Sequence, residues 1–289
     1  MHNIIRAKLY EPEWGSAKMN DSHAHIISDD QARYPAANPA DPGIAAILRE
    51  AFTAERLIAQ MDACGVDKAL LVQRSQIYAF DNRYVLDAAA ANGRLKAVCN
   101  IDVRTSMCGD EAARLHALGA VGFRLMAHIG DKSFDWLDGP HAAAFWSKAA
   151  ELAVPVCVHF FSWNRVEGFS RLAALLDRYP VPDVVIDHMT NCFIESVEQC
   201  GIDDGVKRMA EWPGIALKFT AIPLSSLAER GIDAGLVLSA YMDLFGSDRL
   251  LWGSDVTQSK GAYSEIVTTG RAAVATFSES VQAQLLHAN

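Results

Sequence analysis

The sequence lacks the features of a membrane-spanning or a disulfide-stabilised secreted protein. No apolar stretch approaches the roughly 20 residues that span a bilayer. The first ten residues lack the apolar core of a signal peptide. The six cysteines are scattered and form no C-x-x-C pair. They are typical of buried thiols in a reducing compartment, so we expect a cytoplasmic protein.

Positive charge is also scarce. The chain has 26 lysines and arginines against 35 aspartates and glutamates, which gives a formal charge of −9. This balance argues against a surface for nucleic acid or for an anionic membrane. It still allows an anionic small-molecule substrate, because a few local arginines can override the average charge. No Gly-x-Gly-x-x-Gly follows the first predicted strand, so the usual signature of a nucleotide-binding sheet is missing.

The composition favours a folded chain with a large core, because 51% of its residues are hydrophobic and 21% are charged. Short apolar segments alternate with helical segments at intervals of roughly 30 residues. The predicted strands are residues 21–27, 68–73, 96–102, 120–125, 154–159, 183–188, 214–219 and 250–255. The predicted helices are residues 55–64, 82–92, 110–118, 141–153, 169–179 and 206–212, with further helix within 226–245 and 265–287.

This alternation of strands and helices implies a parallel sheet with crossover helices. Eight such units in 289 residues close most economically into a (β/α)8 TIM barrel. We therefore expect one α/β barrel domain over residues 1–289. An open doubly wound sheet is the alternative fold.

A polar segment, residues 28–43, follows the first predicted strand and contains Pro35, Pro39 and Pro42. Proline opposes regular helix and strand, so the segment is predicted to be a long loop. A loop at this position could serve as a lid over an active site, or it could be an ordinary surface loop.

His23 and His25 lie two residues apart in the apolar run that predicts the first strand. Side chains at positions i and i+2 of a strand point to the same side, so the two imidazoles should reach toward one point. A metal such as zinc takes ligands in this arrangement. Two unrelated histidines at a strand end are the other interpretation.

Polar side chains also stand at the ends of later predicted strands, where TIM barrels carry their active sites. These residues are Gln73, Arg74, Ser75, Arg124, His159, His188, Lys218 and Asp255. With His23 and His25, the set includes four histidines and a carboxylate. Their convergence is difficult to explain as core packing alone.

These residue types are chemically compatible with hydrolysis. The candidate metal ligands are His23, His25, His159 and Asp255. A water at an open metal position would become acidic enough to give hydroxide. Asp255 could take a proton from that water, and His188 could polarise a carbonyl or shuttle a proton. The candidate substrate-binding residues are Arg124 for a carboxylate, Lys218 and Arg165 for the same task, Gln73, Ser75, and Tyr78 for stacking.

With these residues in view, the sequence resembles the amidohydrolase superfamily, and within it the amidohydrolase-2 group. The motifs that carry the resemblance are Asp21-Ser22-His23-Ala24-His25, Val158-His159, Ile186-Asp187-His188 and Trp252-Gly253-Ser254-Asp255. Residues 65–68, 72–75, 81–84 and 122–124 look most like the lactonase branch. That branch includes 2-pyrone-4,6-dicarboxylate lactonase and sugar-acid lactonases.

The resemblance implies that the protein hydrolyses a C–O bond in a small carboxylate-bearing lactone, in the catabolism of aromatic compounds. It implies that Asp255 is the general base and that Arg124 helps to hold the carboxylate. Arg124 stands where binuclear members often have a bridging lysine, so we expect at most one divalent metal, zinc or manganese. Some lactonases of this branch use no metal, and the sequence leaves both cases open. Family members usually continue beyond the position of Asn289, so we expect a shortened last helix.

Two other functions remain open at this stage. The amidohydrolase-2 group also contains metal-dependent non-oxidative decarboxylases of aromatic or muconate-type acids, in which Asp255 would deliver a proton. A non-catalytic binding protein on a barrel scaffold is the third hypothesis. In each case we expect a small anionic ligand and neither a nucleic-acid nor a membrane partner. The sequence does not choose between a monomer and a homo-oligomer.

Overall fold

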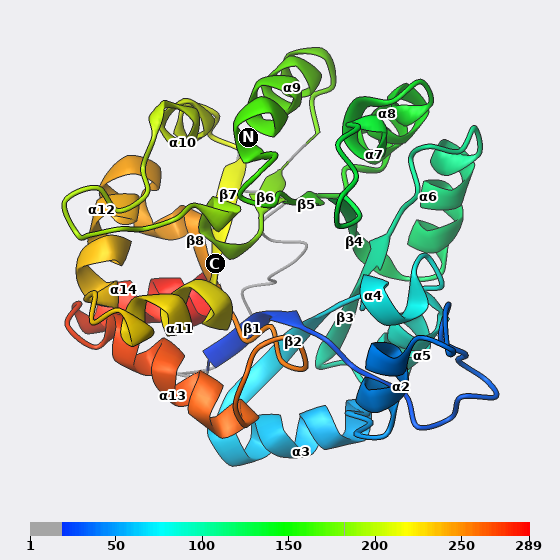
Figure 1. The fold of residues 1–289 in the computed structure, drawn as a ribbon, viewed down its shortest axis with the longest axis horizontal. Coiled ribbons are helices and arrows are strands. Elements are labelled where there is room, and N and C mark those ends of the chain that lie inside the picture. Colours follow the sequence, from blue (N-terminus) through cyan, green and yellow to red (C-terminus); the bar gives the residue numbers. More distant parts are fainter. Residues whose placement is uncertain (1–18, 182) are drawn as a thin grey trace.

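The computed structural model describes residues 19–181 and 183–289. Expectations about the first ten residues lie outside this part of the chain. The strands are β1 (Met19–Ala24), β2 (Val66–Val72), β3 (Leu95–Asn100), β4 (Ala120–Met126), β5 (Val156–His159), β6 (Val184–Ile186), β7 (Ile215–Thr220) and β8 (Leu250–Gly253). They are parallel neighbours in chain order, and helices surround them (Figure 1). The fold is the predicted single-domain TIM barrel.

The helices connect successive strands on the outside of the barrel (Figure 1). The longer ones are α3 (Ala54–Cys64), α5 (Arg83–Ala91), α6 (Cys108–Ala117), α8 (Ala142–Leu152), α9 (Arg165–Arg178), α11 (Ala221–Glu229), α12 (Ala234–Phe245) and α13 (Tyr263–Val274). The shorter ones are α2 (Pro42–Leu48), α4 (Ser75–Tyr78), α7 (Asp135–Asp138), α10 (Asp204–Ala210), α14 (Glu279–Ala283), η1 (His188–Asn191), η2 (Ser247–Arg249) and η3 (Gln284–Ala288). In the described part of the chain, none is both long enough and apolar enough to cross a bilayer.

The helical segment predicted within residues 226–245 contains a break. α11 ends at Glu229, and Gly231 adopts a left-handed backbone with φ of 66°. α12 then begins after Asp233, whose side chain accepts hydrogen bonds from the backbone N–H groups of Gly235 and Leu236. Glycine tolerates positive φ and aspartate is a strong N-cap, so the local sequence explains the break.

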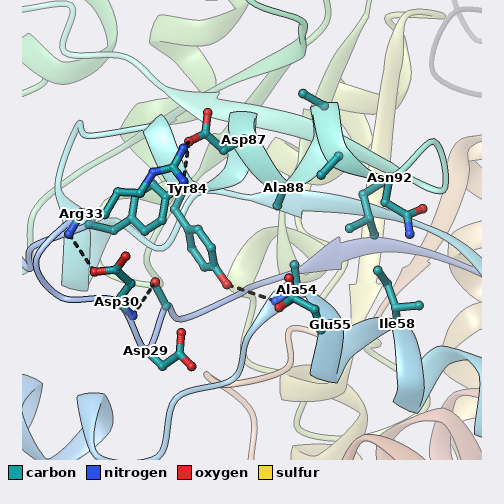
Figure 2. A pocket seen from close by; sticks show the side chains of 15 residues that line it. Asp29, Asp30, Arg33, Ala54, Glu55, Ile58, Tyr84, Asp87, Ala88 and Asn92 are labelled. Atoms are coloured by element: carbon teal, nitrogen blue, oxygen red, sulfur yellow. Dashed lines mark hydrogen bonds and ion pairs between the residues drawn. The ribbon is translucent and has the colours of Figure 1, made fainter.

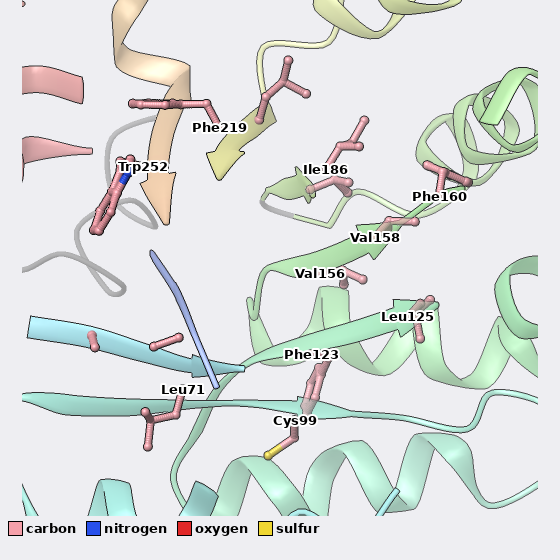
Figure 3. Packing of buried hydrophobic residues seen from close by; sticks show 14 of the residues in the cluster. Leu71, Cys99, Phe123, Leu125, Val156, Val158, Phe160, Ile186, Phe219 and Trp252 are labelled. Carbon is pink, nitrogen blue, oxygen red and sulfur yellow. The ribbon is translucent and has the colours of Figure 1, made fainter. Parts of the chain in front are cut away.

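The strands have two differently packed faces. One face packs against the helices, and it includes Leu71, Phe123 and Trp252 (Figure 3). The alternate strand residues form a separate apolar cluster inside the barrel. Its buried members are Leu70, Val72, Val98, Cys157, Val185, Ala216 and Leu251. Because strand side chains alternate, both faces must be apolar in a sheet that helices cover.

The inward face changes from apolar to polar toward the carboxyl ends of the strands. On β5, Cys157 belongs to the interior cluster, and His159 is the next residue with the same orientation. On β7, Ala216 is followed in the same way by Lys218. The period of two therefore places the functional side chains directly above the apolar floor of the barrel.

Asp21 fastens the last strand to the first. Its Oδ1 accepts hydrogen bonds from the backbone N–H of His23 at 3.0 Å and of Ser254 at 2.8 Å. Its Oδ2 accepts a hydrogen bond from the Tyr263 hydroxyl at 3.1 Å, which brings in α13. The backbone N–H of Asp255 also donates to the His23 carbonyl at 2.6 Å. Asp21 is fully buried, and its contacts bring β1 and β8 together.

The contact between β1 and β8 predicts that Gly253→Ala destabilises the protein. A Cβ on Gly253 would lie 2.6 Å from the His23 Cβ and 3.0 Å from the His23 backbone nitrogen. Since the backbone cannot yield easily there, we expect the free energy of unfolding to fall by about 1–3 kcal/mol. Urea titration followed by circular dichroism measures this change. Gly93→Ala is the control, because nothing lies within 4 Å of its Cβ position. Equal stabilities for the two variants would contradict the predicted close packing.

Candidate active site

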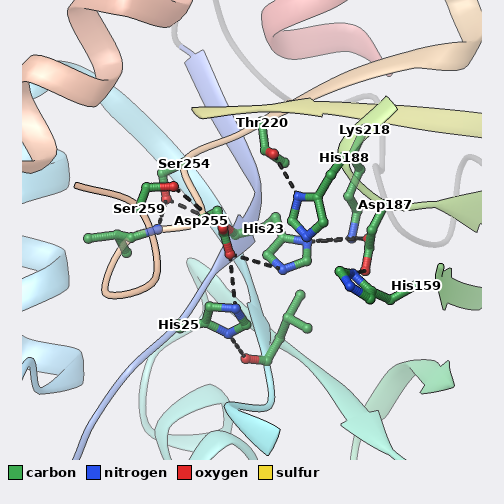
Figure 4. Close-up of polar contacts among 12 residues, drawn as sticks. His23, His25, His159, Asp187, His188, Lys218, Thr220, Ser254, Asp255 and Ser259 are labelled. Carbon is green, nitrogen blue, oxygen red and sulfur yellow. Dashed lines mark hydrogen bonds and ion pairs between the residues drawn. The ribbon is translucent and has the colours of Figure 1, made fainter. Parts of the chain in front are cut away.

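The four predicted histidines, Lys218 and Asp255 converge at the carboxyl end of the barrel (Figure 4). β1 supplies His23, and His25 follows directly after this strand. The later strands and the segments that follow them supply Arg124, His159, Asp187, His188, Lys218, Thr220 and Asp255. All of these side chains are buried. The structure thus brings the four histidines and Asp255 together, and their roles stay predictions.

His23 and His25 both direct their Nε2 atoms toward Asp255. The distance to Asp255 Oδ1 is 3.6 Å from His23 Nε2 and 3.1 Å from His25 Nε2. His25 Nδ1 lies 2.6 Å from the carbonyl oxygen of Val72. A carbonyl only accepts hydrogen bonds, so Nδ1 carries the proton and Nε2 of neutral His25 is an acceptor. This nitrogen and the carboxylate oxygen therefore repel each other unless a proton or a metal ion lies between them.

The pKa values of these groups indicate whether a proton or a metal ion lies between His25 and Asp255. Burial lowers the pKa of His25, and burial also lowers the pKa of His23 well below its ordinary value. Burial alone would raise the pKa of Asp255. However, the contacts of Asp255 with His25, His188 and His23 outweigh burial, so the pKa of Asp255 is lowered. The site thus favours neutral imidazoles beside an ionised carboxylate, which is a donor set for a divalent metal.

Asp187 is the centre of a second cluster. Its Oδ2 accepts a hydrogen bond from Arg124 Nε at 2.8 Å, and its Oδ1 lies 3.3 Å from Lys218 Nζ. The same oxygen lies 3.3 Å from His23 Nδ1. Burial opposes ionisation of this carboxyl, but Lys218 and Arg124 outweigh burial and hold the pKa of Asp187 well below its usual value. Asp187 therefore fixes the positions of three site residues from three different strands.

His159 lies beside Arg124 rather than within the metal-ligand group. Its Nδ1 is 3.2 Å from Arg124 Nη2. Ligand atoms within 4.8 Å of one another define two groups in the described chain, His23–His25–Asp255 and His23–Asp187–His188. His159 is in neither group, so its role as a metal ligand stays a prediction. Burial and the charge of Arg124 lower the pKa of His159 well below its ordinary value.

His188 is held in a strained segment at the end of β6. Its Nδ1 lies 2.7 Å from Thr220 Oγ1, so the hydroxyl orients the ring. The four residues of η1, His188 to Asn191, all have positive φ, between 49° and 67°. Such conformations cost about 1–3 kcal/mol each and cluster at functional sites. A pocket of about 110 Å³ opens beside His188 and is also lined by Phe193 and Ile222.

Arg165 supports this strained segment from outside the histidine cluster. Its Nε donates to the Thr190 carbonyl at 3.2 Å and its Nη2 donates to Thr190 Oγ1 at 3.3 Å. Its Nη1 pairs with Asp203. These contacts account for the Arg165 guanidinium, and its predicted role in substrate binding stays a prediction.

The remaining predicted substrate-binding residues have partners within the protein. Arg124 is paired with Asp187, and Lys218 lies beneath the site with 1% exposure. The Gln73 amide donates to the Asp81 carbonyl and accepts from the Arg74 N–H. The structure places these side chains close to the strand ends, as predicted, but most of their polar atoms already have partners.

Ser75 and Tyr78 lie on α4, immediately after β2. Ser75 Oγ lies 2.9 Å from Met126 Sδ, and the Tyr78 hydroxyl accepts a hydrogen bond from the Ser28 N–H at 2.9 Å. Tyr78 is buried. It therefore holds the start of the long loop after β1, and stacking on a substrate stays a prediction.

The long loop after β1 packs against neighbouring elements. Tyr34 is buried, and its hydroxyl donates to Asp87 on α5 at 2.7 Å. The Ala37 N–H donates to the Ile77 carbonyl at 2.8 Å. Beside the loop, a pocket of about 750 Å³ is lined by residues of α3 and α5, and the four histidines do not line it (Figure 2). The predicted irregular structure is correct, except that α2 begins at Pro42.

Sequence reasoning gave no role to Asp21, Asp187 or Thr220. Asp187 could have been found from its position, because it follows the interior residue Val185 by two and so shares its orientation. Nothing in the local sequence identifies Asp187 as the partner of both Arg124 and Lys218. That pairing depends on strands that are distant in the chain.

Solved structures of other proteins share this architecture. A probable 2-pyrone-4,6-dicarboxylic acid hydrolase from Acinetobacter baumannii, with citric acid bound, has 20% identity, a TM-score of 0.70, and coverage of 94% of this chain and 97% of that chain. An amidohydrolase from Burkholderia multivorans with bound zinc has 20% identity, a TM-score of 0.68, and coverage of 94% and 96%. The 2,6-dihydroxybenzoate decarboxylase from Rhizobium has 15% identity, a TM-score of 0.65, and coverage of 93% and 96%.

At these identities the likeness shows a common fold. No curated protein matches the sequence. The model of the amidohydrolase family matches residues 20–289, which include all of the barrel strands except the first residue of β1, and every site residue described above. The chain therefore belongs to the amidohydrolase family and is an amidohydrolase-2 enzyme with buried histidine and aspartate groups that can bind a metal.

Proposed function

We propose that this enzyme hydrolyses a small lactone that carries a carboxylate. The observation that carries the proposal is the pairing of two neutral imidazoles, His23 and His25, with the ionised carboxylate of Asp255. Such a group of side chains can bind and activate a water molecule. The family match and the fold shared with a probable 2-pyrone-4,6-dicarboxylic acid hydrolase support a lactone substrate.

The residues present fit one divalent metal. His23 Nε2 is buried and has no hydrogen-bond partner in the described chain, and His25 Nε2 faces Asp255 Oδ1 as a second acceptor. We infer that His23, His25 and Asp255 would hold zinc or manganese. When bound, the metal supplies Lewis acidity, which lowers the pKa of water and polarises a carbonyl. The zinc found in the Burkholderia multivorans structure supports the same choice.

The protein residues then have separable tasks. Water attacks the ring carbonyl carbon, and Asp255 accepts the proton that the water loses. The ring C–O bond breaks, and the proton passes from Asp255 to the leaving oxygen, which becomes an alcohol or enol. The carboxylic acid that forms releases the second proton of the water to the solvent and becomes a carboxylate. His188, oriented by Thr220, polarises the carbonyl or relays the proton. Burial of the whole group excludes bulk water, which strengthens each electrostatic contact.

A pH-indicator screen of carboxylated lactones tests the reaction and the metal together. Chelator-treated protein and protein supplied with zinc or manganese are compared on the same panel. We expect acid release only with metal, and one zinc per chain by mass spectrometry. His25→Asn should lose the zinc, because one of the three ligand side chains is changed. Acid release in both samples would contradict a working metal. Carbon dioxide release without hydrolysis would favour decarboxylation instead.

Asp255→Asn tests the general base. The amide keeps the shape of the side chain but can neither accept the proton nor bind a metal as an anion, so we expect the turnover rate to fall by about 100- to 10,000-fold. Circular dichroism should show an unchanged fold. Asp102→Asn is the control, since Asp102 lies after β3 and pairs with Arg104 rather than with a histidine. An Asp255→Asn variant with nearly full turnover would remove Asp255 from the mechanism.

A further inference from the structure

Three arginines are buried near the carboxyl ends of the strands, and only two of them have a carboxylate partner in the described chain. Arg74, Arg124 and Arg165 are 5%, 4% and 7% exposed. Arg124 pairs with Asp187 at 2.8 Å, and Arg165 pairs with Asp203. No carboxylate of residues 19–181 or 183–289 lies within ion-pair distance of Arg74.

The hydrogen bonds of Arg74 leave one edge of its guanidinium almost free. Nη1 donates to Gln76 Oε1 at 2.9 Å. Nη2 makes a long contact of 3.4 Å with the Thr257 carbonyl, and Nε is buried without a partner in the described chain. Nε and Nη2 share the edge on which arginine binds a carboxylate with two parallel hydrogen bonds. In Arg124 the same two atoms are occupied by Asp187 and His159.

A buried charge without an ion-pair partner is costly, so the presence of Arg74 at a buried position calls for an explanation. Moving an ion out of water costs several kcal/mol unless a partner compensates for it. Burial lowers the pKa of Arg74 to about 10, and the charge of Asp255 acts against this effect. The group is therefore still charged at neutral pH. An anionic ligand would supply the missing partner.

Arg74 lies on the side of the site where the reactive residues are. It follows β2 and reaches Thr257 after β8, and β1 lies between these two strands in the closed barrel. The charges of both Arg74 and Arg124 lower the pKa of His25, and the charge of Asp255 raises the pKa of Arg74, so what separates the two arginines is their hydrogen-bond partners. Arg124, by contrast, lies on β4 and bonds toward β5 and β6.

We propose that Arg74 is the residue that binds the carboxylate of the substrate, while Arg124 is a positioning residue held by Asp187. This inference rests on the anionic substrate of the proposed function and reassigns the residue that recognises it. A carboxylate bound on the free Nε–Nη2 edge would fix one end of a flat substrate beside His25 and Asp255. The substrate class is then a small acid whose carboxylate lies a short distance from the bond that is cleaved.

The test compares a charged ligand with a neutral ligand of the same shape. Isothermal titration calorimetry measures the binding of isophthalate and of isophthalamide to wild type, Arg74→Met, Arg74→Lys, Arg124→Met and Arg104→Met, all supplied with zinc. Wild type should prefer isophthalate. In Arg74→Met, affinity for isophthalate should fall by about 10- to 100-fold, the value of charged hydrogen bonds, while affinity for isophthalamide changes by less than about twofold.

The other variants separate the specific interaction from general charge. Arg74→Lys should keep part of the preference for isophthalate over isophthalamide, because lysine keeps the charge but cannot form the bidentate hydrogen bonds. Arg104→Met is the control, since Arg104 is a more exposed arginine at the same end of the barrel that pairs with Asp102. The preference of Arg104→Met for isophthalate over isophthalamide should match that of wild type. Thermal melts should show Arg74→Met to be folded, and isophthalate should raise the melting temperature of wild type but not of this variant.

Three results would overturn the assignment. These are an unchanged preference in Arg74→Met, a selective loss in Arg124→Met instead, or a wild type that does not distinguish isophthalate from isophthalamide. The binding measurements need no turnover. If carboxylates bind through Arg74 but no lactone is opened, the lactonase function fails and the role of Arg74 stands.

Discussion

The buried carboxylate of Asp187 is the contact on which the rest of the site depends. It gathers Arg124 from β4, Lys218 from β7 and His23 from β1 around one side chain. Removing a carboxylate from water is unfavourable, and two cations at short range compensate for that cost. The cluster also sets the direction of the His23 ring, whose Nε2 faces Asp255. The buried ion pairs thereby fix the position of His23, which is a candidate metal ligand.

Asp21 holds β1 and β8 together, where the barrel closes, as Asp187 holds the side chains inside the barrel together. It accepts hydrogen bonds from the backbones of β1 and of the segment after β8, and from Tyr263 of α13. The contact between β1 and β8 is therefore fixed where His23, His25 and Asp255 lie together. Gly253 makes the close approach possible because it has no Cβ. Two buried aspartates thus hold a third, Asp255, beside His23 and His25.

The sequence predicts the barrel well because both faces of its strands are apolar, which is a local pattern. It also predicts that His23 and His25 converge, because that follows from the strand period of two. It could not reveal that Arg124 is occupied by Asp187, because the partner is 63 residues away. It likewise could not show that Gln73 bonds to Asp81 or that His159 stands beside Arg124. Residue type and strand position define the candidates, and long-range pairing decides their roles.

Arg74 and Arg124 illustrate this difference. Both are arginines at the carboxyl ends of strands, and by pattern alone either could bind a substrate anion. The protein supplies Arg124 with a carboxylate and supplies Arg74 with only an amide and a carbonyl oxygen. A neutral partner solvates a guanidinium but leaves its charge uncompensated. The enzyme therefore keeps one positive charge available beside Asp255, and a negatively charged substrate is the molecule that this charge would select.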